Sequence, residues 1–316
     1  MFNVIGKRFW FFLIAGVVIL VCVISLAVFG LKMGVEFSSG SVMTVDFEQG
    51  VEKDDLEQEL AALGYTNAII QSVGEGELLG ATTDEYLIRL PRLSPQEKTG
   101  LEDDLAAAFG IINVREFDDV SEMVAAETTR NATIAVAVAA IGILLYIAWA
   151  FRRMPHPFHY GACAIIALLH DTVVALGVFS ILGGVMEWEI NLMFVTGILA
   201  VIGYSVNNTV VVFDRIRENL TVGSKLGFEV VVNNSLVETM SRSLNTSLTT
   251  LIVILALLLF VGTAIQNFAV VLLVGIIAGT YSSLFIAPSL LVVWQNGEWG
   301  RFLPWKTRPE GKSESG

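Results

Sequence analysis

Residues 9–30 read FWFFLIAGVVILVCVISLAVFG, a run of 22 residues without one charged side chain. A helix needs about 20 apolar residues to cross a hydrocarbon core of about 30 Å, so this run predicts a membrane span. Lys7 and Arg8 precede it, as basic residues precede the core of a signal peptide, but the run is longer than such a core and no clear small-x-small cleavage site follows. We therefore expect an uncleaved anchor.

Five further runs of the same kind predict an α-helical polytopic membrane protein with six transmembrane helices. The spans are expected at residues 9–30, 132–151, 159–182, 190–213, 243–262 and 267–294. The chain is 54% hydrophobic and only 16% charged, which is far more apolar than an ordinary soluble domain. Both cysteines, Cys22 and Cys163, lie inside spans, so we expect inert packing residues rather than disulfide or metal ligands.

Basic residues in short flanking segments resist translocation, so their positions predict the orientation of the spans. With six spans they all fall on one side, which is then the cytoplasm. They are Lys7, Arg8, Arg152, Arg153, Arg215, Arg217, Lys225, Arg301, Lys306, Arg308 and Lys312. We therefore expect residues 1–8, a loop at 214–240 and a disordered tail at 295–316 in the cytoplasm, with residues 31–131 on the opposite, extracytoplasmic side.

Residues 31–131 are expected to form a separate acidic domain. Positions 31–130 hold 21 acidic and 7 basic side chains, a net charge of −14, whereas the rest of the chain sums to +2. Their strand and helix signals follow the order β-α-β-β-α-β, which is typical of a ferredoxin-like α+β domain. The charge distribution does not indicate nucleic-acid binding. The expected strands are 41–48, 68–73, 85–90 and 111–117, and the expected helices are 54–63 and 94–110.

Two local signals sharpen this domain prediction. Ser94, Pro95 and Glu97 predict a capping box at the start of the second helix. The connection between the two middle strands is expected to be a glycine-rich turn with Gly74, Gly76 and Gly80. Because both helices would cover one face of the sheet, the other face or an edge would be free to dock an extended polypeptide.

Asp171 is the clearest ionisable residue inside a predicted span. It lies twelve residues into the third span, near the bilayer midplane, where a charge costs ~2.5–3.5 kcal/mol on insertion scales. One interpretation is a protonated carboxyl that hydrogen-bonds to a neighbouring helix for packing. We favour the other, a proton-carrying or gating carboxyl, because a desolvated aspartate can change its protonation state at neutral pH.

The fourth and fifth spans carry polar stripes at similar depth, so Asn208 and Arg242 could face each other. The stripes are Tyr204, Ser205, Asn207, Asn208 and Thr209, and then Arg242, Ser243, Asn245, Thr246, Ser247, Thr249 and Thr250. A snorkelling interface residue explains Arg242 equally well. Just beyond the fourth span, Asp214, Arg215, Arg217 and Glu218 are readily explained as a solvated ion-pair cluster. Close helix packing is expected at Gly197, Gly203, Gly275 and Gly279.

Four segments together carry a family resemblance: GLKMGVEFSSGS at 30–41, ALLHD at 167–171, GYSVNNTVVVFDRIREN at 203–219 and SRSLNTS at 241–247. They closely resemble SecF, the smaller half of the SecDF protein-export accessory complex and a branch of the RND transporter superfamily. With the six-span layout, the resemblance covers nearly the whole chain. The positions that match family motifs are Gly34, Glu36, Phe37, Gly40, Gly203, Asn207, Asp214, Arg215, Arg217 and Glu218.

The resemblance implies an RND-type half bundle that pairs with SecD. It also implies that the pair assists polypeptide export through the SecYEG channel and its associated translocase subunits, driven by proton flow, or by sodium flow in some relatives. The translocating polypeptide would then be a partner of the extracytoplasmic domain. Neither an enzyme activity nor a cofactor or metal site is implied, and the sequence has no G-x-x-x-x-G-K-[ST] nucleotide loop.

Two departures from the family pattern affect the expected site. After the first span, the family usually has an aspartate and two glycines where this chain has Glu36 and Ser39. More importantly, the span-four motif of the family ends in Asn-Asp, and that aspartate is implicated in proton conduction beside the span-five arginine. Here the position is Asn208, which cannot titrate in the working pH range. The resemblance therefore implies Asn208 and Arg242 as ion-coupling candidates, with Asp171 beside them. If Asn208 is natural, coupling must rest on Asp171 or on SecD carboxylates; if it is engineered, the chain is an uncoupled form.

Three other functions compete with this prediction. A half-size RND exporter would work without SecD. An intramembrane aspartyl protease would need two carboxyls that share a water, but Asp171 is the single clear intramembrane aspartate of the sequence. A structural scaffold of the translocation channel would tolerate the loss of a carboxylate at Asn208.

Overall fold

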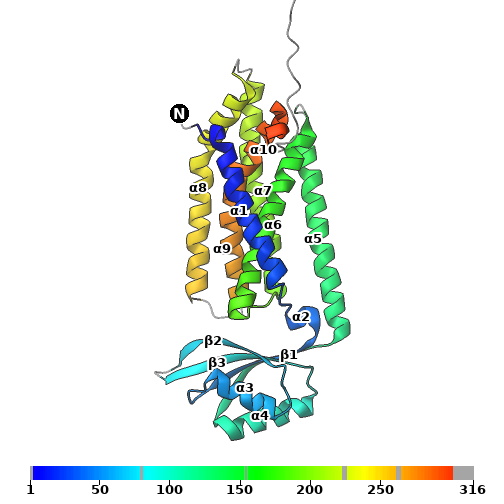
Figure 1. The fold of residues 1–316 in the computed structure, drawn as a ribbon, viewed down its shortest axis with the longest axis vertical. Helices are drawn as coiled ribbons and strands as arrows, with labels where there is room; N and C mark the ends of the chain where they lie inside the picture. Colours follow the sequence, from blue (N-terminus) through cyan, green and yellow to red (C-terminus); the bar gives the residue numbers. More distant parts are fainter. Residues whose placement is uncertain are drawn as a thin grey trace, which may run out of the picture.

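A computed structural model describes the backbone of residues 3–78, 81–152, 154, 156–222, 226–260 and 265–301, and their side chains outside 73–84 and 300–301. A small sheet domain lies at one end of a bundle of long helices (Figure 1). The predictions for Gly80, Arg153, Lys225 and the tail beyond residue 301 lie outside these described residues.

Within the described residues, six helical segments are long and apolar enough to cross a membrane, as the hydropathy pattern predicts. The first five are α1 (Arg8–Val28, after the short turn η1, Ile5–Lys7), α5 (Glu122–Ala150), α6 (Pro157–Met186), α7 (Leu192–Thr221) and α8 (Phe228–Phe260). The last combines α9 (Gln266–Tyr281), a π-turn η3 (Ser282–Ile286) and α10 (Ala287–Asn296), which the turn η4 (Glu298–Arg301) follows. The N-terminus and the end of α10 lie at the end of the bundle opposite the sheet domain (Figure 1).

Several helices extend beyond their apolar runs, which changes the expected boundaries. The α5 helix begins at Glu122 rather than at 132, and Ser121 Oγ caps it by accepting a hydrogen bond from the Val124 N–H (3.4 Å). The expected loop at 214–240 is wrong, because α7 and α8 continue as helices and leave only 222–227 between them. Hydropathy marks the part of a helix that suits lipid, whereas backbone hydrogen bonding continues into the polar region.

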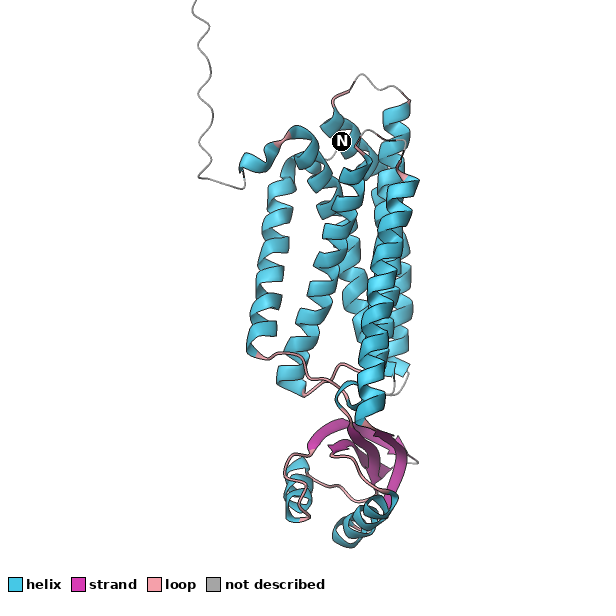
Figure 2. Ribbon diagram, turned by 90° about the vertical axis from the view of Figure 1, so that its right-hand side faces the viewer, coloured by secondary structure: helices cyan, strands magenta, loops and turns pink. Residues whose placement is uncertain are grey.

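The sheet domain has the predicted ferredoxin-like topology. Its elements are β1 (Gly40–Phe47), α3 (Lys53–Ala62), β2 (Ile69–Leu78), β3 (Ala81–Leu90), α4 (Pro95–Phe109) and β4 (Ile112–Val120), after the short helix α2 (Val35–Ser38). The strands are antiparallel in the order β2-β3-β1-β4. The helices α3 and α4 cover one face, where Met43, Val45 and Phe47 pack against helix leucines (Figure 2).

The predicted capping box is confirmed, whereas the predicted glycine turn is not. Ser94 Oγ accepts a hydrogen bond from the Glu97 N–H (3.3 Å), and the Glu97 carboxylate accepts one from the Ser94 N–H (2.7 Å), which lowers the pKa of Glu97. Gly74 and Gly76 lie inside β2, where the register shifts between Ser72 and Gly74. Glycines inside a strand often accompany such a bulge, so they did not mark the turn itself.

The sheet face away from α3 and α4 is turned toward the bundle (Figure 1). From this face, Arg89 Nη1 donates to Glu189 Oε1 (2.5 Å) and to the Met33 carbonyl (2.7 Å). Burial raises the pKa of Glu189, and the pairing with Arg89 opposes that shift. The face that the sequence left free is therefore partly occupied by the chain itself.

Candidate functional site

The Asp171 carboxylate lies halfway along α6 and is fully buried. Its Oδ2 accepts hydrogen bonds from Ser205 Oγ of α7 (2.5 Å) and from Ser282 Oγ at the start of the π-turn (2.8 Å). Its Oδ1 lies 3.0 Å from His170 Nδ1. We call these four residues the Asp171 cluster. Three separate helical elements therefore meet at one carboxylate inside the bundle.

Ser282 reaches Asp171 from an irregular turn of the last span. The π-turn η3 begins at Ser282 and is followed by Pro288 in the first turn of α10. A proline in a helix lacks an N–H and its ring clashes with the carbonyl four residues earlier, here that of Leu284, so a regular α-helix cannot continue unchanged. A π-turn absorbs such a mismatch, and π-turns occur frequently at functional sites.

Glycines let α7 approach α9 closely enough to form the Asp171 cluster. A Cβ added at Gly279 would lie 3.0 Å from Ser205 Cβ, and one at Gly275 would lie 2.2 Å from Val201 Cγ2. Gly197 is similarly close to Val271, at 2.9 Å. The predicted close packing is thus confirmed at these three glycines. At Gly203, by contrast, a Cβ would meet no atom of the described residues within 4 Å, so this chain supplies no close contact there.

Asn208 lies one turn beyond Ser205 on α7 and is only 3% exposed. Its Nδ2 has no hydrogen-bond partner among the described residues. A buried amide without a hydrogen-bond partner costs about 1–3 kcal/mol of stability, so burial of Asn208 is unfavourable when the chain is alone. The position thus lies close to the Asp171 cluster but outside its hydrogen-bond network.

Arg242 is exposed, whereas Asn208 is buried. It lines a surface pocket of about 500 Å³, together with Val211, Asp214, Arg215, Glu218, Glu238 and Thr239. In the described part of the chain no hydrogen bond joins Arg242 to Asn208, and Arg242 has no ion pair within 4 Å. The structure therefore does not bring the two expected coupling residues together. At this level of the bundle Tyr204 joins α7 to α8, because its hydroxyl donates to Ser247 Oγ (3.0 Å).

The charged residues at this end of α7 form the predicted ion-pair cluster. Arg217 pairs with Asp214 (2.5 Å), and Arg215 pairs with Glu218 (2.6 Å) and with Glu238 of α8 (2.6 Å). Exposed pairs of this kind contribute about 0–1 kcal/mol each. They tie α7 to α8 and surround Arg242 with carboxylates that already have partners.

A polar stripe runs from this pocket along both helices. Asn207 lies seven residues before Asp214 on α7, and Asn245 and Thr249 follow Arg242 by three and seven residues on α8. Residues at these spacings share one side of a helix. All of them are exposed in this chain. We call this set (Asn207, Asp214, Arg242, Asn245, Thr249) the α7–α8 polar stripe.

The glycine motif after α1 joins the sheet domain to the bundle. The Gly34 N–H donates to the Ile190 carbonyl (2.8 Å), and Gly40 has φ +128° with Leu90 O only 2.8 Å from where a Cβ would lie. Ser39 adopts φ +64° and ψ +163°, a region that is essentially reserved for glycine. The Ser39 backbone therefore has a conformation that is strained for any residue with a side chain. Glu36 also belongs to this glycine motif, and the negative charge of its carboxylate contributes to the raised pKa of Glu189.

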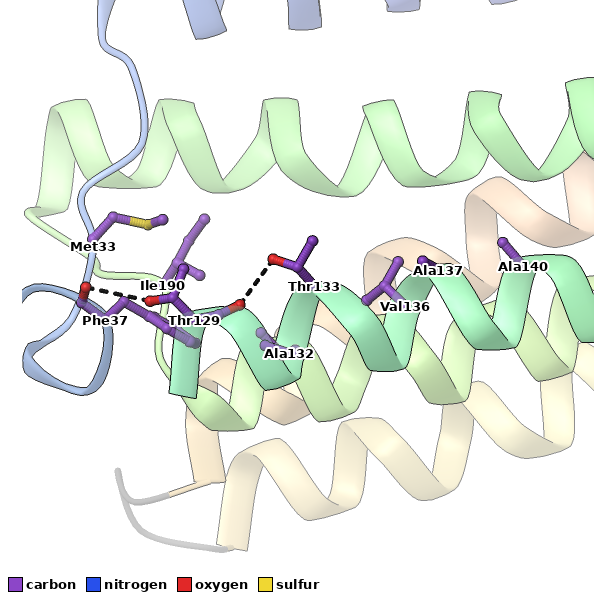
Figure 3. Close-up of a pocket in the computed structure, with 10 residues that line it drawn as sticks. Met33, Phe37, Thr129, Ala132, Thr133, Val136, Ala137, Ala140 and Ile190 are labelled. Atoms are coloured by element: carbon purple, nitrogen blue, oxygen red, sulfur yellow. Dashed lines mark hydrogen bonds between the residues drawn. The ribbon is translucent and has the colours of Figure 1, made fainter. Parts of the chain in front are cut away.

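Phe37 of this motif lines an apolar cavity of about 460 Å³ between α2, α5 and the start of α7. Thr129 of α5 points toward Phe37 and donates a hydrogen bond to its carbonyl (3.5 Å; Figure 3). Small side chains of α5, including Ala132, Ala137 and Ala140, line the rest of the cavity. The motif therefore anchors one end of α5, while the middle of that helix stands apart from the bundle.

Sequence reasoning found Asp171 but not its full set of partners. His170 stood inside a recognised segment without a role, and Ser205 was noted only as part of a polar stripe. Ser282 was missed altogether. The available signal was a pair of serines shortly before a proline in an otherwise apolar span, which indicates an irregular turn with free hydroxyls.

Comparison with known proteins identifies related sequences over the whole chain. Residues 101–297 match the family described as protein export membrane protein SecD/SecF, C-terminal, and residues 24–51 match the SecD/SecF GG motif. The SecF protein translocase subunit of Thermobaculum terrenum is 43% identical over 98% of this chain and 99% of its own length. That of Anaerolinea thermophila is 38% identical over 98% and 99%.

Solved structures agree with this similarity. The crystal structure of SecDF from Thermus thermophilus, described as a translocon-associated membrane protein, superimposes with a TM-score of 0.83 at 33% identity. The match covers 93% of this chain and 39% of that chain. The chain thus corresponds to less than half of the longer SecDF protein.

Proposed function

The chain belongs to the SecD/SecF family of protein-export membrane proteins, and from this premise we propose that it is the SecF half of a SecDF complex that uses an ion gradient to assist translocation through the SecYEG channel. Its near full-length similarity to SecF subunits supports a role in Sec protein translocation. Its similarity to one part of the longer SecDF chains supports pairing with SecD in a membrane.

The proposed orientation places both termini in the cytoplasm and the sheet domain outside. The N-terminus, the end of α7, the start of α8 and the end of α10 lie at the bundle end opposite the sheet domain (Figure 1). Arg8, Arg215 and Arg217 lie at this end, whereas the sheet domain is acidic, and basic flanks favour the cytoplasmic side.

The α7–α8 polar stripe is the surface that we propose SecD covers. An exposed arginine and two exposed asparagines on spanning helices would face lipid if the chain stood alone, and such groups usually face a bundle interior or a partner. A SecD carboxylate opposite Arg242 would supply the charge that Asn208 does not carry. This arrangement also favours a paired subunit over a half-size exporter that acts without SecD.

The observation that carries ion coupling is the fully buried Asp171 carboxylate with hydrogen-bonding groups from three elements. One elementary charge that moves through about 100 mV releases ~2.3 kcal/mol, which is available on the outer face where ATP is not. We propose the proton as the coupling ion, since an Asp next to a His is suited to proton exchange. Protein translocation then gains energy from proton flow through this bundle.

A structural scaffold is the second candidate, and the uncharged amide at Asn208 favours it. The deciding experiment measures preprotein export into vesicles that contain this chain, SecD and the SecYEG channel, with and without an imposed proton gradient. Coupling predicts that the gradient stimulates export and that omission of SecD abolishes this stimulation. Export that depends on the chain but never on the gradient would establish the scaffold.

The variant Asn208→Asp distinguishes the two possible routes of coupling in the same assay. Stimulation that is already present with Asn208 indicates a route through other groups, of which Asp171 is the foremost. If stimulation appears only after the carboxylate is introduced, the chain as it stands is uncoupled.

A further inference from the structure

The starting observation is an imidazole beside the buried carboxylate. The His170 side chain is 9% exposed and its Nδ1 lies 3.0 Å from Asp171 Oδ1. Its other ring nitrogen, Nε2, is buried and has no hydrogen-bond partner among the described residues. A buried polar atom without a partner is unusual and needs an explanation.

With Asp171 ionised, the hydrogen bonds around it indicate which nitrogen of the His170 ring carries the proton. An ionised carboxylate only accepts hydrogen bonds, and a neutral imidazole has one donor nitrogen and one acceptor nitrogen. Because Asp171 Oδ2 already accepts from Ser205 and Ser282, a donating Nδ1–H completes three donors around an ionised Asp171. Nε2 then carries the lone pair, which is the free proton-accepting position of the cluster.

Among the described residues, the groove that His170 lines contains no charged side chain. On the α1 and α9 sides, His170 lines this groove of about 350 Å³ with Ile14, Ala15, Val18, Val174, Val274, Ile277, Ala278 and Tyr281. Tyr281 is the one other titratable group there, and its ring stacks on His170 at 6.2 Å while its hydroxyl donates to the Phe11 carbonyl (2.8 Å). From α7 and η3, the hydroxyls of Ser205 and Ser282 donate to the neighbouring Asp171 carboxylate.

We propose that His170 and Asp171 form one proton-binding pair, in which Nε2 of the imidazole takes up the proton and Asp171 supplies the fixed counter-charge. In the step, the Nε2 lone pair forms an N–H bond, the ring changes from neutral to +1, and the pair changes from −1 to zero. An isolated charge is strongly disfavoured in a low-dielectric interior, so neutralisation of the pair favours proton uptake. Release reverses the same step.

Two consequences follow for the position of the pair. The groove beside the ring is lined by apolar surface, so that side of the pair offers a water molecule no hydrogen-bonding surface. Ser282 links the pair directly to the π-turn, so a change of charge acts on the one irregular turn of the last span. The pair lies apart from the α7–α8 polar stripe. This inference rests on the proposed function only where proton uptake is said to drive export, and proton binding by the pair does not depend on it.

Histidine labelling tests the pair without reference to export. The chain has three histidines, so ring-15N labelling in lipid vesicles gives three imidazole spectra, and His170→Asn identifies one of them. We expect a neutral His170 ring with the proton on Nδ1 and a protonated Nε2 as the pH is lowered. In Asp171→Asn, proton binding by this ring should weaken by about tenfold or more, because the counter-charge is lost. A neutral ring with its proton on Nε2, or an unchanged titration in Asp171→Asn, would overturn the proposal.

Two substitutions separate proton uptake from mere positioning of Asp171. In His170→Asn, an amide N–H can take the place of Nδ1–H but cannot titrate, whereas in His170→Gln the amide lies nearer the place of Nε2. Proton uptake predicts that both variants lose the gradient-dependent part of export. Full stimulation in His170→Asn with loss only in His170→Gln would reduce His170 to a positioning residue and contradict the proposal.

His159 provides the matched control on the same helix. Its Nδ1 is also buried without a partner among the described residues, but its ring stacks on His156 and Trp294 rather than facing a carboxylate. His159→Asn should keep gradient-dependent stimulation. If wild-type export ignores the gradient, the proposed function fails while the ring titration still decides the proton-binding pair.

Discussion

The Asp171 cluster and the α7–α8 polar stripe are two polar regions on neighbouring helices with opposite architecture. In the cluster, a fully buried carboxylate is surrounded by groups of this same chain, and glycines bring those groups together. In the stripe, Arg242 is exposed and lacks an ion pair within the described residues. The difference indicates that the cluster can work within one chain, whereas the stripe depends on what a partner places against it.

The largest effect is expected at the Asp171 cluster. Asp171→Asn keeps a side chain that can hydrogen-bond to Ser205 and Ser282 but carries no negative charge to balance a proton on His170. We expect complete loss of the gradient-dependent part of export, measured in vesicles with SecD and the channel, with normal amounts of folded protein. Unchanged stimulation would return Asp171 to a packing role and remove the functional side of the comparison.

Substitutions in the α7–α8 polar stripe should have an effect only when a partner is present. Arg242→Leu removes a charge that has no ion pair in the described chain, so the melting temperature of the isolated protein should change little. Association with SecD, measured by titration in detergent, should weaken by about 2 kcal/mol or more if a buried carboxylate pairs with Arg242. Equal binding by the variant would show that the stripe is not the SecD interface.

An added methyl group tests how closely α7 and α9 pack at the Asp171 cluster. In Gly279→Ala the added Cβ meets Ser205 Cβ at 3.0 Å, so we expect a destabilisation of about 1–3 kcal/mol and reduced gradient stimulation. Gly203→Ala on α7 is the control, because its Cβ meets nothing within 4 Å and alanine favours the helix by up to about 1 kcal/mol. Similar melting temperatures for the two variants would contradict the close approach of α7 and α9.

The Arg89–Glu189 ion pair is intermediate between the Asp171 cluster and the α7–α8 polar stripe. Its two charges are partners within this chain, but they join the sheet domain to the bundle. Burial raises the pKa of Glu189 in the docked domain, and release into water would return it to the ordinary value. Docking therefore binds protons, so its stabilisation is complete below the ordinary glutamate pKa and is lost as the pH rises through the raised one. We expect a small effect, with the domain held more tightly as the pH falls.

Spin labels at the exposed positions Thr99 and Val185 measure this docking by their distance distribution at each pH. Glu189→Gln keeps an oxygen for Arg89 and should remove the pH dependence. Arg89→Ala leaves Glu189 buried without its partner and should release the domain. A domain that loosens as the pH falls would reverse the expected sign.

Much of the architecture was predictable because its determinants are local. The apolar runs, the capping box at Ser94 and the strand and helix periodicities each lie within a few residues of one another, and the structure confirms the six-helix layout and the ferredoxin-like topology. Element ends were less predictable. The prediction of a loop at 214–240 was wrong because polar helical turns and polar loops have similar amino-acid composition.

The candidate site shows where prediction from sequence stopped. A carboxyl at the middle of the third span could be recognised from hydropathy alone, and the family motifs came from segments of contiguous residues. Its partners come from three elements: His170 adjacent in sequence, Ser205 34 residues later and Ser282 111 residues later. No local pattern contains those separations.

By itself, the amino-acid sequence determined the number of spans, the order of the domain, the family and the presence of one intramembrane aspartate. Only the tertiary structure decided that Asp171 is enclosed with His170 and Ser282, and that Arg242 lines a surface pocket without a hydrogen bond to Asn208 among the described residues. The reason is that hydropathy and periodicity report the environment of each helix. The rotation of one helix against another depends on close packing between distant residues, such as Gly279 and Ser205.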